Sequence, residues 1–432
     1  MTVHALARIL NDALNSQNDL AYALLSSRGR GIYFPSKGIL GQSAEAKDKA
    51  INATIGTALE DDGSPLTLGV IEDMVTVPKA SFLYAPSFGA PNLRIRWKEM
   101  LTGKNPGLAG KAFSTPVVSA ALTNGLSVTG YMFVDEGDEI IIPDLYWDNY
   151  DLLFEQGFGA SFRTFNTFKD GGFDVNALAA ALADGTVGKR IVLLNFPNNP
   201  TGYTPTVEEA DAIVQVLVDA AKRGNKVLAI LDDAYFGLVY QEGIVTESLF
   251  AQLADAHENI LAVKLDGPTK EDYVWGLRVG FITFAYKGAT EEQLKALESK
   301  AAGTIRGTLS NVPNVSQAIL LAAYNSAEYA SQKQAKYETL KKRYEAIQQI
   351  FAAHPEYAES FTPKPFNSGY FMCVQLNGVD PEAVRQLLLE KYSTGVIVLS
   401  GLIRLAFSSV PLSQLAQLFE NLHLAVSDVR GK

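Results

Sequence analysis

The sequence has little of several residue types that mark particular classes of protein. Its 432 residues contain one cysteine, Cys373, which excludes an intramolecular disulfide. Four histidines are scattered and none lies at ligand spacing from a cysteine or carboxylate, so no metal site is expected. No run approaches eighteen uninterrupted apolar residues, and polar residues interrupt the first twenty, which do not resemble a secretion signal. We therefore expect no membrane partner and a cytoplasmic location.

Positive charge is in the minority. The chain carries 37 Lys and Arg against 47 Asp and Glu, a formal net charge of -10. Nucleic acids and anionic membranes attract clustered Lys and Arg, so no nucleic-acid partner is expected. The hydrophobic content of 47% allows large cores, and a chain of this length normally forms more than one domain. We expect an enzyme or binding protein with a small-molecule ligand.

Short apolar runs alternate with helical patterns between about residues 115 and 286. Runs rich in Val, Ile and Leu, typical of strands buried on both faces, lie at residues 139–143, 190–196, 226–231 and 260–265. Residues 207–223 have the apolar spacing of a crossover helix that ends at Gly224. The run at 279–286 follows its predecessor too closely for a crossover and should pair antiparallel. The pattern predicts an α/β fold with a mostly parallel sheet flanked by helices.

The last third of the chain has a different pattern. Residues 315–352 are helical without an internal proline or glycine, and could form one long helix bridging two domains. Residues 369–376 and 396–407 alternate like strands, with a helix at 381–392 between them. We expect a large domain at 65–325 and a smaller α+β domain built from the N- and C-terminal segments, 1–64 and 326–432.

Lys270 is the most informative residue, because Gly-Leu-Arg-Val-Gly follows it and places Arg278 eight residues later. This pair suits an amine that forms a Schiff base beside an arginine that holds a phosphate. Asn-Pro-Thr-Gly at 199–202 and Asp-Asp-Ala-Tyr at 232–235 each follow a predicted strand. In this order and spacing, the motifs resemble a fold-type I pyridoxal phosphate enzyme of the class I/II aminotransferase family, similar to aspartate aminotransferases.

The resemblance implies pyridoxal 5'-phosphate as cofactor and assigns roles to residues. Lys270 would hold the cofactor and move the substrate proton, and Asp232 would face the pyridine nitrogen as a charge-assisted partner. Tyr235 and Asn199 would hydrogen-bond the ring's phenolic oxygen, and Trp147 would stack on the ring, with Tyr150 a weaker candidate. The implied catalytic residues are Lys270, Asp232 and Tyr235.

Residues 123–127, Thr-Asn-Gly-Leu-Ser, resemble the family's glycine turn. A turn that opens a helix presents free backbone NH groups to an anion, which suits a cofactor phosphate. The residues implied to contact the cofactor are Gly125, Leu126, Ser127, Trp147, Asn199, Asp232, Tyr235, Thr269, Lys270, Arg278 and Tyr84.

Substrate contacts follow from the same resemblance. Arg404 matches the family's arginine that binds a substrate α-carboxylate, because a planar guanidinium can donate two parallel hydrogen bonds to it. By the same resemblance, Gly56 and Asn199 would also contact the substrate. Tyr84 resembles a tyrosine that reaches the phosphate of a neighbouring subunit, which implies a homodimer with shared active sites. Arg306, four residues before Ser-Asn, resembles an arginine that binds a distal carboxylate across the dimer. Dicarboxylic substrates are therefore possible.

The sequence departs from the family in two places. Gly267 replaces the usual phosphate-contacting serine, for which Thr269 could compensate, and Asp266 beside it would repel a phosphate unless it points away or pairs with Arg278. The loop at 398–402, before Arg404, is unusually short.

The reaction has more than one interpretation. The leading one is an aminotransferase that moves an amino group between an L-amino acid and a 2-oxo acid. A β-lyase or a decarboxylase could use the same scaffold and lysine, because a fold does not fix a function. A non-catalytic binding protein is the least favoured alternative, since the lysine is intact.

Overall fold

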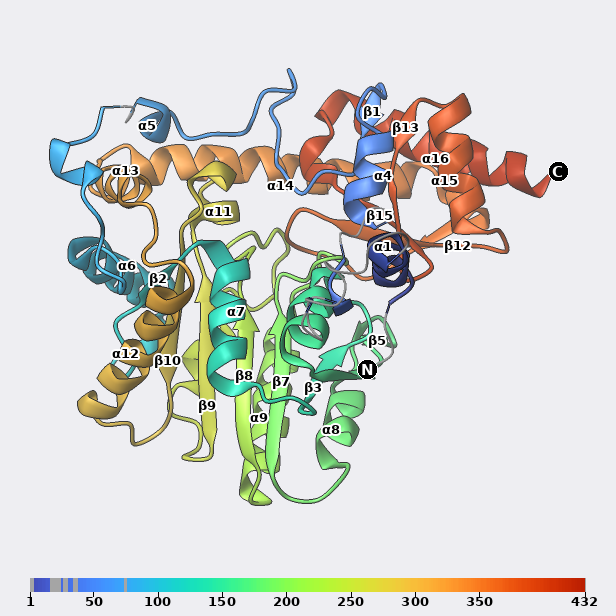
Figure 1. The fold of residues 1–432 in the computed structure, drawn as a ribbon. Coiled ribbons are helices and arrows are strands. Elements are labelled where there is room, and N and C mark those ends of the chain that lie inside the picture. Colours follow the sequence, from blue (N-terminus) through green and yellow to red (C-terminus); the bar gives the residue numbers. More distant parts are fainter. Residues whose placement is uncertain (1–3, 16–24, 26–29, 34–37, 74–75, 432) are drawn as a thin grey trace.

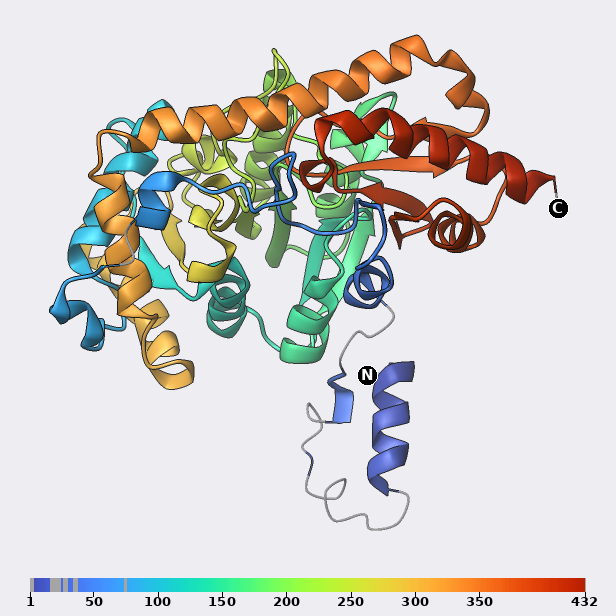
Figure 2. The same cartoon turned by 90° about the horizontal axis from the view of Figure 1, so that it is seen from above.

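The computed structural model describes residues 4–431 except 16–24, 26–29, 34–37 and 74–75. Two main β-sheets organise the chain, one of seven strands and one of four, and a long helix, α14 (Tyr329–Ala353), runs beside both (Figures 1 and 2). Within the described ranges, no helix combines the length and apolar character needed to cross a membrane. The domain boundaries near residues 65 and 325 stay a prediction.

The large sheet has the expected arrangement. Its strand order is β2 (Val117–Ser119), β10 (Gly280–Ala285), β9 (Ile260–Asp266), β8 (Lys226–Asp232), β7 (Lys189–Asn195), β3 (Glu139–Pro143) and β4 (Ser161–Phe165). Every neighbouring pair from β9 to β4 is parallel, whereas β10 is antiparallel to both β9 and β2. The predictions of a mostly parallel sheet and of an antiparallel run after β9 are confirmed.

Both faces of this sheet are buried, which explains the continuous apolar runs. Ile191 and Leu193 pack into one core, and Val192 and Leu194 pack into another on the opposite face. Helices α7 (Ala121–Phe133) and α12 (Glu291–Thr308) cover the first face, in front of the sheet in Figure 1. The other core includes residues of α6 (Pro91–Lys104), α8 (Val175–Ala183), α9 (Val207–Lys222) and α10 (Leu249–Leu253).

The small sheet has the order β11 (Phe361–Pro363), β12 (Met372–Leu376), β15 (Leu402–Leu405) and β14 (Ile397–Leu399). Helices α15 (Pro381–Lys391) and α16 (Leu415–Arg430) pack beside it. From the N-terminal segment, β1 (Ile51–Asn52) pairs parallel with β13 (Thr394–Gly395), and α4 (Ile39–Glu45) packs against β14 (Figure 1). The N-terminal segment therefore does fold back onto the C-terminal part.

Shorter elements complete the chain. Helix α1 (Ala5–Asn15) precedes the other elements and lies apart from both sheets (Figure 2). Three short helices connect the main elements: α5 (Gly69–Glu72), α11 (Pro268–Glu271) and α13 (Asn314–Tyr324). The other connecting elements are the hairpin of β5 (Phe168–Lys169) and β6 (Gly172–Phe173), a π-helical turn at Asp151–Gln156 and 3-10 turns at Lys79–Phe82, Pro106–Leu108, Trp275–Leu277, Pro355–Glu359, Phe407–Ser409 and Leu412–Gln414.

Two predicted elements are divided in the structure. The predicted helix at 315–352 is two helices, because α13 ends at Tyr324 and α14 begins at Tyr329. Asn325 and Ser326 between them have side chains that compete with helical hydrogen bonding. The predicted strand at 396–407 is a hairpin, since Ser400 and Gly401 adopt φ angles of 50° and 75° and turn the chain between β14 and β15. This tight turn is the short loop before Arg404.

Candidate functional site

A cavity of about 400 Å³ opens at the carboxyl ends of the parallel strands, the edge at which open α/β sheets bind ligands. Strands β7 and β8 contribute Asn195 and Asp232, and the small sheet contributes Arg404. The cavity brings together these predicted residues: Gly56, Trp147, Asn199, Asp232, Tyr235, Thr269, Lys270, Arg278 and Arg404.

The amine of Lys270 lies inside this cavity. Lys270 belongs to the short helix α11 after β9, and its Nζ donates a hydrogen bond of 2.8 Å to the carbonyl oxygen of Gly56. Burial lowers the pKa of Lys270 to about 8, with help from the positive charges of Arg278 and Arg404 and opposed by Asp232. A larger share of the amine is therefore neutral near physiological pH, which is the form that attacks a carbonyl carbon.

Asp232 is the buried acid of the site. One carboxylate oxygen accepts a 2.6 Å hydrogen bond from the Tyr150 hydroxyl, and the other accepts a 3.2 Å bond from the backbone NH of Ala234. Burial raises the pKa of Asp232 to about 6, although the Tyr150 bond, the Ala234 NH and Lys270 all act in the opposite direction. A cation placed beside this carboxylate would be strongly attracted.

Tyr150 has a role that sequence reasoning missed. Its ring is fully buried and perpendicular to Trp147, with centroids 5.4 Å apart, while its hydroxyl binds Asp232. Tyr150 also lines the cavity, and the weaker prediction that its ring stacks on a ligand stays a prediction. No local signal could reveal the contact with Asp232, because the two residues lie 82 positions apart.

Arg404 is a buried guanidinium that forms no ion pair with a carboxylate among the described residues. Its terminal nitrogens donate to the side-chain oxygen of Asn199 at 3.2 Å and the carbonyl oxygen of Thr54 at 3.0 Å. Its carbon Cζ lies 4.4 Å from the ring centroid of Phe371, and its Nε has no partner among the described atoms. Burial lowers the pKa of Arg404, although it remains a base strong enough to stay charged. Such a group can bind an anion.

The helix end at the cavity lies earlier than predicted. Helix α7 begins at Ala121, and Ala121, Leu122 and Thr123 line the cavity. The prediction that Gly125 opens the helix is wrong, because the NH groups of Gly125, Leu126 and Ser127 lie beyond the free first turn. A Cβ on Gly125 would stand 3.1 Å from Leu265, and Leu126 is fully buried in the core. The chain therefore presents the NH groups near Ala121 to any anion.

The structure explains both sequence departures beside Lys270. A Cβ on Gly267 would lie 2.9 Å from the Cα of Gly280, so this close approach leaves no room for serine. Asp266 accepts a 3.1 Å hydrogen bond from Trp97 and lies 3.5 Å from the amine of Lys264, so it points away from the cavity. The Thr269 hydroxyl donates a long bond of 3.4 Å to Val279 O and lines the cavity.

Three predicted residues are exposed. Arg278 lies at the cavity rim in a left-handed conformation, φ 53°, and donates to Trp275 O at 3.2 Å. Tyr84 is 90% exposed and does not line the cavity. Arg306 on α12 donates to the Ser310 hydroxyl at 2.8 Å and also lies outside the cavity. Within a single chain, the structure does not bring Tyr84 or Arg306 to the site.

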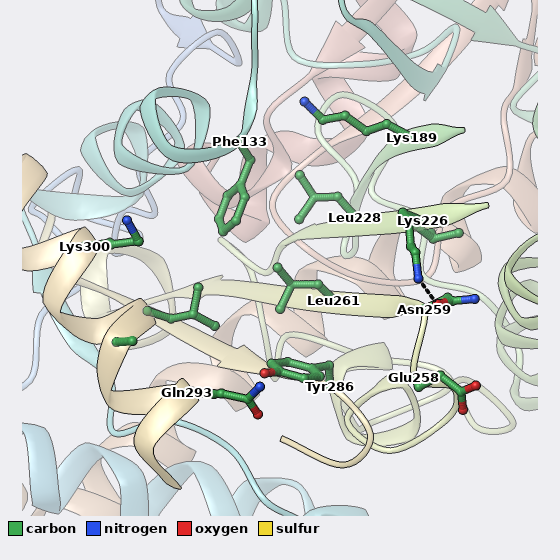
Figure 3. Close-up of a pocket in the computed structure, with 13 residues that line it drawn as sticks. Phe133, Lys189, Lys226, Leu228, Glu258, Asn259, Leu261, Tyr286, Gln293 and Lys300 are labelled. Atoms are coloured by element: carbon green, nitrogen blue, oxygen red, sulfur yellow. Dashed lines mark hydrogen bonds between the residues drawn. The ribbon is translucent and has the colours of Figure 1, made fainter. Parts of the chain in front are cut away.

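A second cavity of about 450 Å³ lies at the opposite ends of the strands, between α7 and α12 (Figure 3). Its walls are mostly apolar, and it contains none of the predicted site residues. Lys226 at its edge bonds Asn259, and Lys189 bonds Asp138 at 2.5 Å. Only the first of these two cavities is lined by Asp232, Lys270 and Arg404, which together supply a carboxylate, an amine and a guanidinium.

Comparisons with known proteins agree with this geometry. The model of the family described as aminotransferase class I and II matches residues 57–422. The chain is 26% identical over 211 residues to the aspartate aminotransferase of Bacillus subtilis, a match that spans 48% of each chain. It is 23% identical over 371 residues to the mitochondrial aspartate aminotransferase of Schizosaccharomyces pombe, covering 82% of this chain and 81% of that one.

A solved aminotransferase structure from Anaerococcus prevotii has a TM-score of 0.80 and 24% identity, covering 93% of this chain and 99% of that one. This likeness shows the shared fold. The matches to several curated relatives span about half the length of those relatives or less.

Proposed function

Because the chain belongs to the aminotransferase class I and II family, we propose that it is a pyridoxal phosphate-dependent aminotransferase acting between an L-amino acid and a 2-oxo acid. The observation that carries the proposal is the convergence of Lys270, Asp232 and Arg404 on one cavity. Each supplies a group that the reaction needs: an amine that can lose its proton, a buried carboxylate, and a guanidinium that makes no ion pair among the described residues.

The donor set of the cavity fits pyridoxal phosphate. Lys270 supplies the amine for the aldehyde, and Asp232, whose pKa burial raises to about 6, supplies a buried carboxylate that a protonated ring nitrogen would stabilise in its charged form. Arg278 at the rim and the first turn of α7 supply positive charge for a phosphate. When bound, the cofactor withdraws electrons from the substrate α-carbon.

Each residue around the cavity would then have a separate role in the reaction. Arg404 binds the α-carboxylate of the substrate and Asn199, already bonded to that guanidinium, limits its rotation. Lys270 takes the proton from the α-carbon, for which its pKa of about 8 is well matched to neutral solution. Asp232, held by Tyr150, keeps a negative charge at the closed end of the cavity.

Absorbance spectra of the purified protein with pyridoxal phosphate test this proposal. We expect a band of the protein-bound cofactor that glutamate, aspartate, alanine or tyrosine converts to the aminated cofactor, and that a 2-oxo acid restores. Release of pyruvate or carbon dioxide without amination would instead indicate a β-lyase or a decarboxylase. Failure to bind the cofactor would indicate a non-catalytic protein.

We also propose a homodimer with shared sites, supported by an exposed apolar segment. Phe82, Leu83 and Tyr84 are 75%, 70% and 90% exposed, and such neighbouring apolar side chains are typical of interfaces. Asn314 donates to the carbonyl oxygen of Leu83 at 3.1 Å, only three positions beyond Asn311 in the Ser-Asn motif. The segment with Tyr84 therefore contacts the chain that follows α12, the helix that carries Arg306, and we propose that both residues reach a partner's cavity.

Arg306 makes the substrate class testable. If Arg306 binds the distal carboxylate of aspartate or glutamate, Arg306→Leu should weaken binding of the transition state by about 2 to 5 kcal/mol. The kcat/KM for these two substrates should then fall roughly 30- to 4,000-fold. Alanine turnover should change little, because alanine lacks that carboxylate. Steady-state kinetics with the three amino acids measure the difference, and Arg223→Leu, which removes another exposed arginine, is the control.

Mixing variants tests whether Arg306 acts across the dimer. Neither Arg306→Leu nor Lys270→Ala alone has a complete site for aspartate, but a mixed dimer would combine the intact Lys270 of one subunit with the intact Arg306 of the other. Random reassociation should restore about a quarter of the sites. Equal losses for aspartate and alanine, or no recovery on mixing, would contradict this assignment.

A further inference from the structure

The residue after Lys270 carries a carboxylate with unusual surroundings. Glu271 is only 2% exposed, yet it contacts two lysines from separate helices. The amine of Lys104, at the end of α6, lies 2.8 Å from one of its oxygens, and the amine of Lys333 on α14 lies 3.3 Å from the other. Burial opposes the ionisation of Glu271, but the two lysines outweigh it and lower its pKa.

The next residue, Asp272, is fully buried and is held even more tightly. It accepts hydrogen bonds from the hydroxyls of Tyr324 at 2.9 Å and Tyr329 at 2.7 Å, and from Lys333 at 2.7 Å. Burial disfavours the charged form of Lys333, but Asp272 and Glu271 raise its pKa well above the usual value. Two carboxylates and two amines therefore balance in charge at this position.

The helix that carries the reactive lysine cannot hold itself in place. Helix α11 has four residues, and a single turn forms too few hydrogen bonds to fix its own conformation. One external bond to its backbone, from the Tyr370 hydroxyl to Lys270 O, measures 2.8 Å. The ionic contacts of the two residues after Lys270 add to the hydrogen bonds that Thr269 donates to Val279 O and Lys270 donates to Gly56 O.

Helix α14 connects this restraint to Arg404. Ten residues after Lys333, about 15 Å along the helix, the fully buried Arg343 donates hydrogen bonds to Ser408 O at 2.5 Å and Leu59 O at 2.6 Å. Ser408 lies four residues after Arg404, just beyond the end of β15. One rigid helix therefore contacts both the turn of Lys270 and the chain that follows Arg404.

We propose that Lys104, Glu271, Asp272 and Lys333 form a positioning cluster that fixes the Lys270 amine relative to Arg404 through α14. The inference rests on the proposed function, since it concerns how the two groups of that site keep their separation. The four residues do not line the cavity, so they act through Lys270 and do not touch the substrate.

Charge-altering variants separate positioning from simple stability. Lys333→Met leaves both carboxylates without one of their cations, and the added negative charge on the two residues that follow Lys270 should raise the pKa of its amine. The rate at which cofactor-free protein captures pyridoxal phosphate, measured against pH, should shift its midpoint upward by roughly half a pH unit or more. In the loaded enzyme, kcat should fall about tenfold with little change in KM.

Rescue distinguishes charge from packing. The double variant Lys333→Met/Asp272→Asn removes one charge of each sign and should return the midpoint towards that of the unchanged protein. If Lys333→Met prevents folding, Tyr329→Phe replaces it as the test. This variant removes one hydrogen bond to Asp272 and keeps the ring, so it should lower kcat by a smaller factor. None of these variants alters Arg278, Arg404 or Asp232, the charged groups that face Lys270, nor the neighbouring cluster of Lys264, Asp233 and Asp266.

Glu298→Gln is the matched control. It breaks a comparably enclosed ion pair, in which Glu298 on α12 lies 2.7 Å from Arg94 on α6, without any contact to α11. It should lower the melting temperature and leave the capture midpoint in place. A Lys333→Met protein that also loses only melting temperature would overturn the positioning cluster. An unchanged protein that captures no cofactor would overturn the proposed function itself.

Discussion

Lys270→Ala is expected to reduce transamination about 10⁴-fold or more, the largest loss of any single substitution in this chain. The variant removes the amine that lies 2.8 Å from Gly56 O inside the cavity, and with it both the covalent hold on the cofactor and the base for the substrate proton. The surrounding residues remain, so binding of the cofactor should weaken but not disappear.

Single-turnover absorbance with glutamate measures this loss without depending on product release. Lys300→Ala is a suitable control, since Lys300 is an exposed lysine at the second cavity (Figure 3), and its rate should equal that of the unchanged protein. A Lys270→Ala protein that retains a rate within tenfold of the original would show that another group transfers the proton.

The fold could be predicted where local pattern and burial agree. Strand β8 was predicted at residues 226–231 and is found at Lys226–Asp232, because a strand buried on both faces leaves a continuous apolar run in the sequence. Helix α9 was predicted equally well from its apolar spacing and from Gly224, which follows its end with a positive φ.

Predictions from the sequence failed where backbone geometry is set by distant contacts. Ala121 opens α7 with a φ of 62°, a conformation more typical of glycine, and the backbone of Gly280 lies directly beneath it. The sequence offered Gly125 as the visible turn residue, so the free helix end was predicted one turn too late. The unusual residue at the true helix end gives no local signal.

The site itself divides in the same way. Lys270 and Asp232 could be predicted to lie at one cavity because their motifs follow strands in a recognisable order, whereas the residues that contact them could not. Arg404 reaches Asn199 across 205 positions, and Asp272 binds Tyr324 across 52. Phe371, beneath the Arg404 guanidinium, was likewise not predicted, because only the folded chain places it there.

Asp232→Asn is expected to have two opposite effects, a loss of activity and a gain in the stability of the cofactor-free protein. Asparagine cannot supply the negative charge that a cationic ring requires, so transamination should fall roughly 10²- to 10³-fold. In the cofactor-free protein that same charge is a burden, because burial raises the pKa of Asp232 from 3.8 to about 6.

The sign of the stability effect follows from proton binding. Between pH 3.8 and about 6 the unfolded chain has released this proton while the folded protein retains it, so the stability of the folded protein falls as pH rises through this range. Above pH 6 the full penalty of about 3 kcal/mol is present. Asp232→Asn removes the penalty, and its advantage should disappear as pH falls towards 4.

Urea unfolding of the cofactor-free proteins between pH 4 and pH 8 measures this difference. Asp135→Asn, at a side chain that is 92% exposed, should show no pH-dependent gain. If Asp232→Asn were less stable than the unchanged protein at pH 8, the charged carboxylate would stabilise the folded cofactor-free protein, which would contradict this prediction. The expected gain would mean that the folded chain holds Asp232 in an unfavourable charged state that only a bound cation relieves, which ties the cost in stability directly to the proposed chemistry.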